Sequence, residues 1–227
     1  TVIEQETQIL MFLDPELAKI MENHIKTKAA NVITNNAVSE FLGENGKLTA
    51  VKLKNGTELP CELAVVAIGV IPNKTLAEKA GLKIGNTKAI EVNEFMQTSD
   101  ENIYAAGDCI EIPNLLTGIK NNAPYGDLAN LEGRVAGENA IRGNIKKFPV
   151  TIHTGICKVF DYSAGSTGMS EYKAKKTGFD VTSVIIAGPD KPGFMKGKIL
   201  ISKITADNKT GRLLGFQCVG AGDVSKQ

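Results

Sequence analysis

NIYAAGD, residues 102–108, is the stretch on which the interpretation of this chain depends. It predicts a short buried strand that ends at Asp108 and is followed by a loop and then a helix. Ala105, Ala106 and Gly107 are small, so a ligand can approach the backbone closely there. Ligands of α/β proteins usually bind at strand ends, where an aspartate can accept hydrogen bonds from a ribose or polyol hydroxyl. The alternative is an aspartate that only caps the following turn.

Three other stretches extend this pattern in chain order: TVIEQ (1–5), AVVAIGVIPN (64–73) and FPVTIHTGICKVFDYSAGSTGMSE (148–171). Together with NIYAAGD they resemble the pyridine nucleotide-disulfide oxidoreductases, and the last stretch is most similar to the NADH oxidase and coenzyme A-disulfide reductase branch. The resemblance implies an α/β fold, namely the latter part of a flavoprotein with two dinucleotide-binding domains, for FAD and NAD, plus part of an α+β dimerisation domain.

The resemblance also implies a domain order. Residues 1–73 are expected to be the C-terminal part of the NAD(H)-binding domain, 74–147 the returning segment of the FAD-binding domain, and 148–227 a partial dimerisation domain. The chain begins within a predicted strand and stops at GAGDVSKQ, where a helix is expected to begin. We therefore expect a fragment truncated at both ends.

The composition limits the kinds of partner that this chain is expected to bind. The formal net charge is +1, which gives no reason to expect nucleic acid or an anionic membrane as a partner. No apolar run approaches the roughly 18 residues of a membrane span, and we expect a cytoplasmic protein. The 4 cysteines are scattered singly, without a CxxC pair, so neither a dithiol motif nor a metal site is predicted.

Glu4 is the candidate for binding the nicotinamide cofactor. It occupies the place where a nucleotide-binding βαβ unit carries its acidic residue, at the end of the second strand, and such a carboxylate can accept both ribose hydroxyls of NAD while repelling a 2′-phosphate. Glu6 adds negative charge, which favours NADH over NADPH. The resemblance further places Gly69 against the nicotinamide nucleotide, because a residue without Cβ lets the cofactor approach. A plain turn glycine is the alternative there.

Several elements between these sites follow from local pattern. Asp14-Pro15-Glu16 predicts a helix start, followed by an apolar face at helical spacing. Asn-Gly pairs at 45–46 and 55–56 predict type I′ turns in a three-stranded meander. ELAVVAIG (62–69) predicts a strand covered on both faces. A short helix at 75–81, a strand near 89–92 and a loop at 110–123 complete the segment.

Residues 123–143 predict a helix that starts near Pro124 and Asp127. Its apolar stripe is expected at Leu128, Leu131 and Val135, and a stripe of small residues at Ala129, Gly133 and Gly137 is expected to allow close packing. In the related enzymes the N-terminus of this helix points at the flavin pyrimidine ring, where its positive end stabilises reduced flavin. The resemblance therefore implies contacts from Leu128, Ala129 and Asn130, made largely by backbone, and assigns Asp108 to a ribityl hydroxyl of FAD.

From Phe148 onward, strand-like runs at 155–160, 179–187, 198–205 and 212–219 alternate with a short helix at 170–177. This is similar to the family's dimerisation domain, an antiparallel sheet with helices on one side. Residues 190–193 predict a loop. Coenzyme A-disulfide reductases carry substrate-contacting tyrosines in this region and none stands here, so the resemblance does not extend to coenzyme A specificity.

The implied activity of the complete protein is FAD-dependent NADH oxidation, with a disulfide, peroxide or oxygen as the small-molecule acceptor, in a homodimer. The redox cysteine of the family is expected upstream of this chain, so no catalytic residue is assigned here, and the 227 residues alone are expected neither to hold FAD tightly nor to turn over. Two alternatives remain: an electron-transfer subunit that reduces a protein partner, and a non-catalytic assembly module of the same fold.

Overall fold

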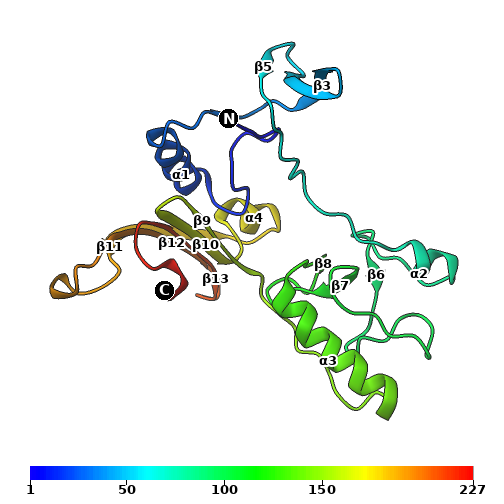
Figure 1. Cartoon of the computed structure of the whole chain (residues 1–227). Coiled ribbons are helices and arrows are strands. Elements are labelled where there is room, and N and C mark those ends of the chain that lie inside the picture. The colour runs from blue at the N-terminus through cyan, green and yellow to red at the C-terminus, as the bar shows by residue number, and fades with distance from the viewer. Residues whose placement is uncertain (227) are drawn as a thin grey trace. The chain divides into compact units, whose positions relative to one another are not determined.

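A computed structural model describes residues 1–226 of the chain as two compact units (Figure 1). The first unit combines residues 1–66 with the segment from residue 154 onward, and the second comprises Ala67–His153. Among the described residues, no helix is long and apolar enough to cross a membrane.

The N-terminal part of the first unit contains one helix and two small sheets. Strand β1 (Val2–Ile3) pairs in parallel with β2 (Val32–Ile33), and helix α1 (Pro15–Thr27) lies between them in the chain. The predicted helix start is confirmed, because Asp14 is the N-cap and Pro15 the first helical residue. Strands β3 (Val38–Glu44), β4 (Lys47–Leu53) and β5 (Glu58–Pro60) form the predicted antiparallel meander in the order β3-β4-β5.

The two Asn-Gly turns of this meander differ. Asn45 and Gly46 both have positive φ angles, 51° and 76°, as a type I′ turn requires. In the second pair only Gly56 has a positive φ, 87°, and the Asn55 side chain instead accepts a hydrogen bond from the Thr57 amide at 3.1 Å. The type I′ prediction is therefore confirmed for the first turn and wrong for the second, where the asparagine folds back on its own backbone.

The C-terminal part of the first unit is a five-stranded antiparallel sheet in the order β11-β12-β13-β10-β9. Its strands are β9 (Thr154–Val159), β10 (Tyr162–Gly168), β11 (Val181–Pro189), β12 (Ile199–Asp207) and β13 (Leu213–Gly220), with helix α4 (Glu171–Lys176) after β10. Four strands and the helix match the prediction, whereas β10, rich in Ser and Gly, was not predicted. Past β13 there is only a short 3₁₀ helix at Val224–Lys226, and position 227 of the expected helix lies outside the described residues.

Helix α1 packs its apolar face on the C-terminal sheet. Leu17 and Met21 are fully buried, in a cluster with Ala164 of β10 and Val219 of β13. Burying a side chain of this size stabilises the fold by about 1.5–3 kcal/mol. The predicted apolar stripe of this helix is therefore core packing, and it joins the N-terminal and C-terminal parts of the chain into one unit.

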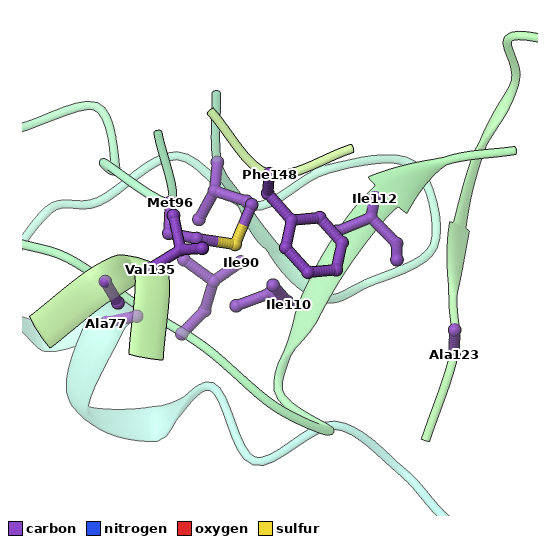
Figure 2. Close-up of a cluster of buried hydrophobic side chains, with 10 residues drawn as sticks. Ala77, Ile90, Met96, Ile110, Ile112, Ala123, Val135 and Phe148 are labelled. Atoms are coloured by element: carbon purple, nitrogen blue, oxygen red, sulfur yellow. The ribbon is translucent and has the colours of Figure 1, made fainter. Parts of the chain in front are cut away.

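The second unit surrounds a small sheet. Strands β6 (Ile90–Glu91) and β7 (Ile110–Pro113) pair in parallel, and β8 (Lys120–Asn122) pairs antiparallel with β7. The helices are α2 (Thr75–Lys79) and α3 (Gly126–Arg142). Figure 2 shows the core, in which Met96, Val135 and Phe148 converge with Ile90, Ile110 and Ile112 of the strands.

Three predictions between residues 62 and 123 are wrong. ELAVVAIG (62–69) is not a strand covered on both faces, since it pairs with no strand of the described chain and the side chains of Val65 and Ile68 are 85% and 93% exposed. NIYAAGD is half-buried and lacks a regular strand, apart from a single bridge between Tyr104 and Gln97. The backbone turns at Gly107, whose φ of 85° interrupts an extended run, and the strand β7 follows Asp108 instead of preceding it. The expected loop at 110–123 is therefore the β7–β8 hairpin.

Candidate functional site

A tight turn carries the Asp108 side chain. The Ile110 amide donates a hydrogen bond to the Gly107 carbonyl at 3.1 Å, so Asp108 and Cys109 form the middle of a four-residue turn. Gly107 has a φ of 85°, in the left-handed region that glycine adopts without strain. Glycine therefore suits the backbone conformation directly before the aspartate, and it also permits close approach of another part of the chain.

The middle and the end of this turn are held by the small sheet. The Asn122 side-chain amide donates to the carbonyl oxygens of Asp108 and Ile110, at 2.7 and 2.8 Å. The Ile90 amide donates to the Cys109 carbonyl at 2.8 Å. Because β8 and β6 both hold its backbone, the turn is rigidly placed at the edge of the sheet.

The Asp108 side chain takes no part in these contacts, which are made by its backbone. The residue is exposed, and its side chain has no hydrogen bond or ion pair within the part of the chain that the structure describes. Its side chain therefore does not serve as a cap for the following turn among these residues. Up to four lone pairs on an ionised carboxylate are available for ligand hydroxyls.

The start of helix α3 lies against the same turn. A Cβ added to Gly107 would stand 3.5 Å from the Cβ of Ala129, which is in the first turns of α3. The N-cap residue Tyr125 gives no side-chain hydrogen bond to the helix, and the first intrahelical bond joins the Ala129 amide to the Tyr125 carbonyl at 2.9 Å. The amides preceding Ala129 are thus the free donors typical of a helix N-terminus.

The remaining residues of α3 correct the predicted stripes. Leu128 and Val135 pack on the core as expected, but Leu131 is 51% exposed. Of the small residues, Ala129 approaches Gly107, whereas a Cβ at Gly133 or Gly137 would meet no atom within 4 Å. The small-residue stripe therefore allows close approach at its first position only.

Two polar residues of α3 were missed by the sequence analysis. Glu132 and Asn139 are 2% and 1% exposed, and both lie on the face that carries Leu128 and Val135. The Glu132 Oε2 accepts a hydrogen bond from the Gly107 amide at 2.8 Å. The available signal was their spacing, since positions 128, 132, 135 and 139 follow one helical stripe.

The electrostatics of the site are dominated by acidic groups. Burial raises the pKa of Glu132, the hydrogen bond from Gly107 opposes that rise, and the nearby charge of Asp108 adds to it. Burial likewise raises the pKa of the Cys109 thiol, with smaller contributions from Asp108 and Glu132. The site thus favours hydroxyl donors at Asp108 and disfavours a thiolate at Cys109.

Cys157 and Cys218 are no better suited to thiolate chemistry than Cys109. Burial raises the pKa of Cys157 and of Cys218, which is fully buried in β13. A raised pKa keeps a thiol protonated near neutral pH and lowers its nucleophilicity.

The candidate nicotinamide residues lie in different units. Glu4 directly follows β1, as predicted, and its Oε1 accepts a hydrogen bond from the Glu6 amide at 3.0 Å. Gly69 belongs to the second unit, where it has a φ of 101° and open space around the position of a Cβ. In the second unit the structure therefore brings together Gly107, Asp108 and the start of α3. Glu4 and Gly69 belong to different units, and each is described by itself.

Comparison with known proteins identifies the family. The sequence model of the pyridine nucleotide-disulphide oxidoreductase family matches residues 1–123, and that of the family's dimerisation domain matches residues 154–225. The chain belongs to the pyridine nucleotide-disulphide oxidoreductases, which confirms the resemblance found in the sequence.

Individual relatives have the same fold over nearly the whole chain. An NADH oxidase of Methanocaldococcus jannaschii is 34% identical over 227 residues, covering 100% of this chain and 50% of its own length. The structure of a NAD-dependent persulfide reductase from A. fulgidus matches with a TM-score of 0.94 and 44% identity, over 99% of this chain and 42% of that one. An FAD-dependent pyridine nucleotide-disulphide oxidoreductase from Desulfovibrio vulgaris matches with a TM-score of 0.86 and 32% identity, over 99% of this chain and 54% of that one. The chain spans about half the length of the curated relatives it matches, or less.

Proposed function

We propose that this chain contributes the flavin-contacting and nicotinamide-contacting residues of an FAD-dependent NADH oxidoreductase. The observation that carries the proposal is the exposed Asp108 carboxylate in a rigid turn whose Gly107 abuts Ala129 of α3. An acceptor for hydroxyls and a helix N-terminus thereby face the same ligand. Bound FAD would supply the chemistry of passing electrons from NADH to an acceptor.

The residues of this site suit FAD. Gly107 has no side chain and a φ of 85°, and a Cβ there would stand 3.5 Å from the Cβ of Ala129, so the start of α3 can lie close to the turn that carries Asp108. We assign Asp108 to a ribityl hydroxyl, and the backbone of Leu128, Ala129 and Asn130 to the flavin ring. The Ala129 amide already donates to the Tyr125 carbonyl, so the free amides are those up to Leu128. These amides would stabilise negative charge on reduced flavin, as a helix N-terminus does for any anion.

The nicotinamide side of the proposal involves Glu4 and Gly69. Glu4 directly follows β1, which we assign as the second strand of the nucleotide-binding βαβ unit, and an acidic residue at the end of that strand accepts ribose hydroxyls of NAD. One of its oxygens already accepts from the Glu6 amide, and the carboxylate retains lone pairs for a ligand. We assign Gly69 to close approach of the same cofactor.

The domain assignment follows from these roles. We propose residues 1–73 as part of the NAD(H)-binding domain, 74–147 as the returning segment of the FAD-binding domain and 148–227 as part of the dimerisation domain. The match of 154–225 to the family's dimerisation domain supports a homodimeric complete protein.

The acceptor is proposed to be a sulfur–sulfur bond, with peroxide and oxygen as the competing acceptors. The similarity to a persulfide reductase at 44% identity supports this choice. The cysteines of this chain with raised pKa values do not suit attack on sulfur. We therefore do not assign the reactive thiol of the complete protein to Cys109, Cys157 or Cys218.

One experiment tests the proposal. The complete protein should purify yellow, and anaerobic NADH should bleach its visible flavin absorbance. The variant Asp108→Ala should bind FAD about 10- to 100-fold more weakly, because it loses a hydrogen bond to a charged group, whereas Glu101→Gln, a change on an exposed neighbour, should bind normally. A wild-type protein that binds no flavin, or an Asp108→Ala variant with unchanged FAD affinity, would contradict the proposal.

A further inference from the structure

Glu132 is a buried carboxyl group without a cation. It lies on α3, is only 2% exposed, and makes no ion pair within residues 1–226. Its Oε2 accepts the Gly107 amide at 2.8 Å. A buried acidic group is costly to desolvate, and a carboxyl that forms its hydrogen bond to a backbone amide only partly recovers that cost.

The same helix touches Gly107 in two ways. The methyl group of Ala129 stands 3.5 Å from the position of a Gly107 Cβ, and Glu132, one turn further along, holds the Gly107 amide. Packing and a hydrogen bond thus act on a single residue from successive turns of α3. Gly107 begins the turn that carries Asp108, so α3 contacts this turn at the residue directly before the aspartate.

The other hydrogen bonds that hold this turn do not involve its first residue, Gly107. Asn122 binds the carbonyl oxygens of Asp108 and Ile110, and the Ile90 amide binds the carbonyl of Cys109. All of these contacts lie at or after Asp108. The amide of Gly107 is the anchor on the preceding side, and Glu132 is its acceptor.

We propose that Glu132 is a positioning residue for the flavin site, which fixes the Asp108 carboxylate at a set distance from the N-terminus of α3. This inference rests on the proposed function, since the ligand that both groups would face is FAD. The carboxyl of Glu132 need not touch the ligand. It acts by holding the Gly107 amide, and the side-chain carbonyl oxygen of a glutamine in its place could do the same.

The test compares three substitutions at this position in the complete flavoprotein. Glu132→Gln keeps an acceptor of equal reach, Glu132→Asp keeps the charge but is one methylene shorter, and Glu132→Leu removes the acceptor. FAD affinity would be measured by reconstitution of the apoprotein, and the environment of the bound flavin by visible circular dichroism. Glu138→Gln, on the exposed side of the same helix with partners Arg142 and Lys146, is the matched control.

We expect Glu132→Leu to weaken FAD binding about 10- to 100-fold and Glu132→Gln to stay within about threefold of wild type. Glu132→Asp should fall between them and alter the flavin circular dichroism. If Glu132→Leu fails to fold, the FAD affinities of the other two variants test the inference. Tighter binding by the glutamine variant than by the aspartate variant would support it, because only glutamine is long enough to hold the Gly107 amide. Equal affinities and spectra for all variants would overturn the inference while leaving the proposed function intact. A wild-type protein without flavin would overturn both.

Discussion

Asp14 and Lys203 form an ion pair in the interior of the first unit, with 3.1 Å between Oδ2 and Nζ and side chains that are 2% and 3% exposed. Lys203 lies on β12 and also contacts Glu16 and Glu171, each at 2.8 Å. The Asp14 oxygens accept the amides of Glu171 and Tyr172 at 3.0 and 3.3 Å, so the N-cap residue of α1 caps helix α4 instead of its own helix. One aspartate thereby joins two helix starts to the C-terminal sheet.

This arrangement predicts a large cost for removing the lysine. Lys203→Met would leave the buried Asp14 carboxylate without its cation, and breaking one partner of a buried pair costs about 3–5 kcal/mol. Urea unfolding followed by far-UV circular dichroism would measure the loss. Lys19→Met removes a pair with Glu22 in which the lysine is 58% exposed, and should change the free energy of unfolding by less than about 1 kcal/mol. Equal effects of the two substitutions would refute the structural role of Lys203.

The same cluster predicts a dependence of stability on pH. Hydrogen bonds from Lys175 and Lys203 lower the pKa of Glu171 from 4.5 to about 2. A carboxyl whose pKa is depressed by folding stabilises the folded state above its unfolded pKa, and that contribution is lost as the pH falls through the folded pKa. Wild type should therefore lose stability between pH 4.5 and about 2, and Glu171→Gln should lose less over this range. Parallel curves for the two proteins would show that Glu171 does not contribute.

The sequence correctly predicted those elements that depend on the backbone preferences of a few neighbouring residues. The Asp14-Pro15 start of α1 and the Asn45-Gly46 turn depend on the backbone preferences of those residues, and both are confirmed. Strand β10 was missed because its stability comes from pairing on both sides, with β9 and β13, and not from its own Ser- and Gly-rich residues.

The sequence predicted individual residues of the candidate site but not how those residues are arranged. Asp108 and the α3 start were recognised from a family resemblance, yet Asp108 was placed at the end of a strand because the small residues before it resemble a buried run. The positive φ of Gly107 turns the backbone before β7, and the residues that contact Gly107, Ala129 and Glu132, lie more than 20 positions further along the chain. The burial of Glu132 was indicated by its helical spacing with Leu128 and Val135, but no local signal identifies its partner, the Gly107 amide, which lies 25 residues earlier in the chain.

A substitution at Gly107 separates strain from packing. Gly107→Ala forces an L side chain to a φ of 85°, while its Cβ would meet Ala129 at an ordinary 3.5 Å. We expect destabilisation by about 1–2 kcal/mol from the backbone alone, with weaker FAD binding. Gly133→Ala, in the interior of α3 with open space around the new methyl, should instead stabilise by about 0.5–1 kcal/mol. Thermal denaturation of both variants tests the prediction, which fails if the two shifts have the same sign.

The nicotinamide preference is predicted to depend on Glu4. An acidic residue that accepts ribose hydroxyls also repels a 2′-phosphate, so Glu4→Ala should lose affinity for NADH and lose its discrimination against NADPH. Removing a hydrogen bond to a charged group costs about 1.5–3 kcal/mol, so the ratio of kcat/KM for NADH over NADPH should fall at least about tenfold in the complete protein. Glu6→Ala is the control, because that exposed neighbour contributes only longer-range charge that salt screens. If wild type prefers NADPH, or if Glu6→Ala changes the ratio as much as Glu4→Ala, the cofactor is selected by another residue.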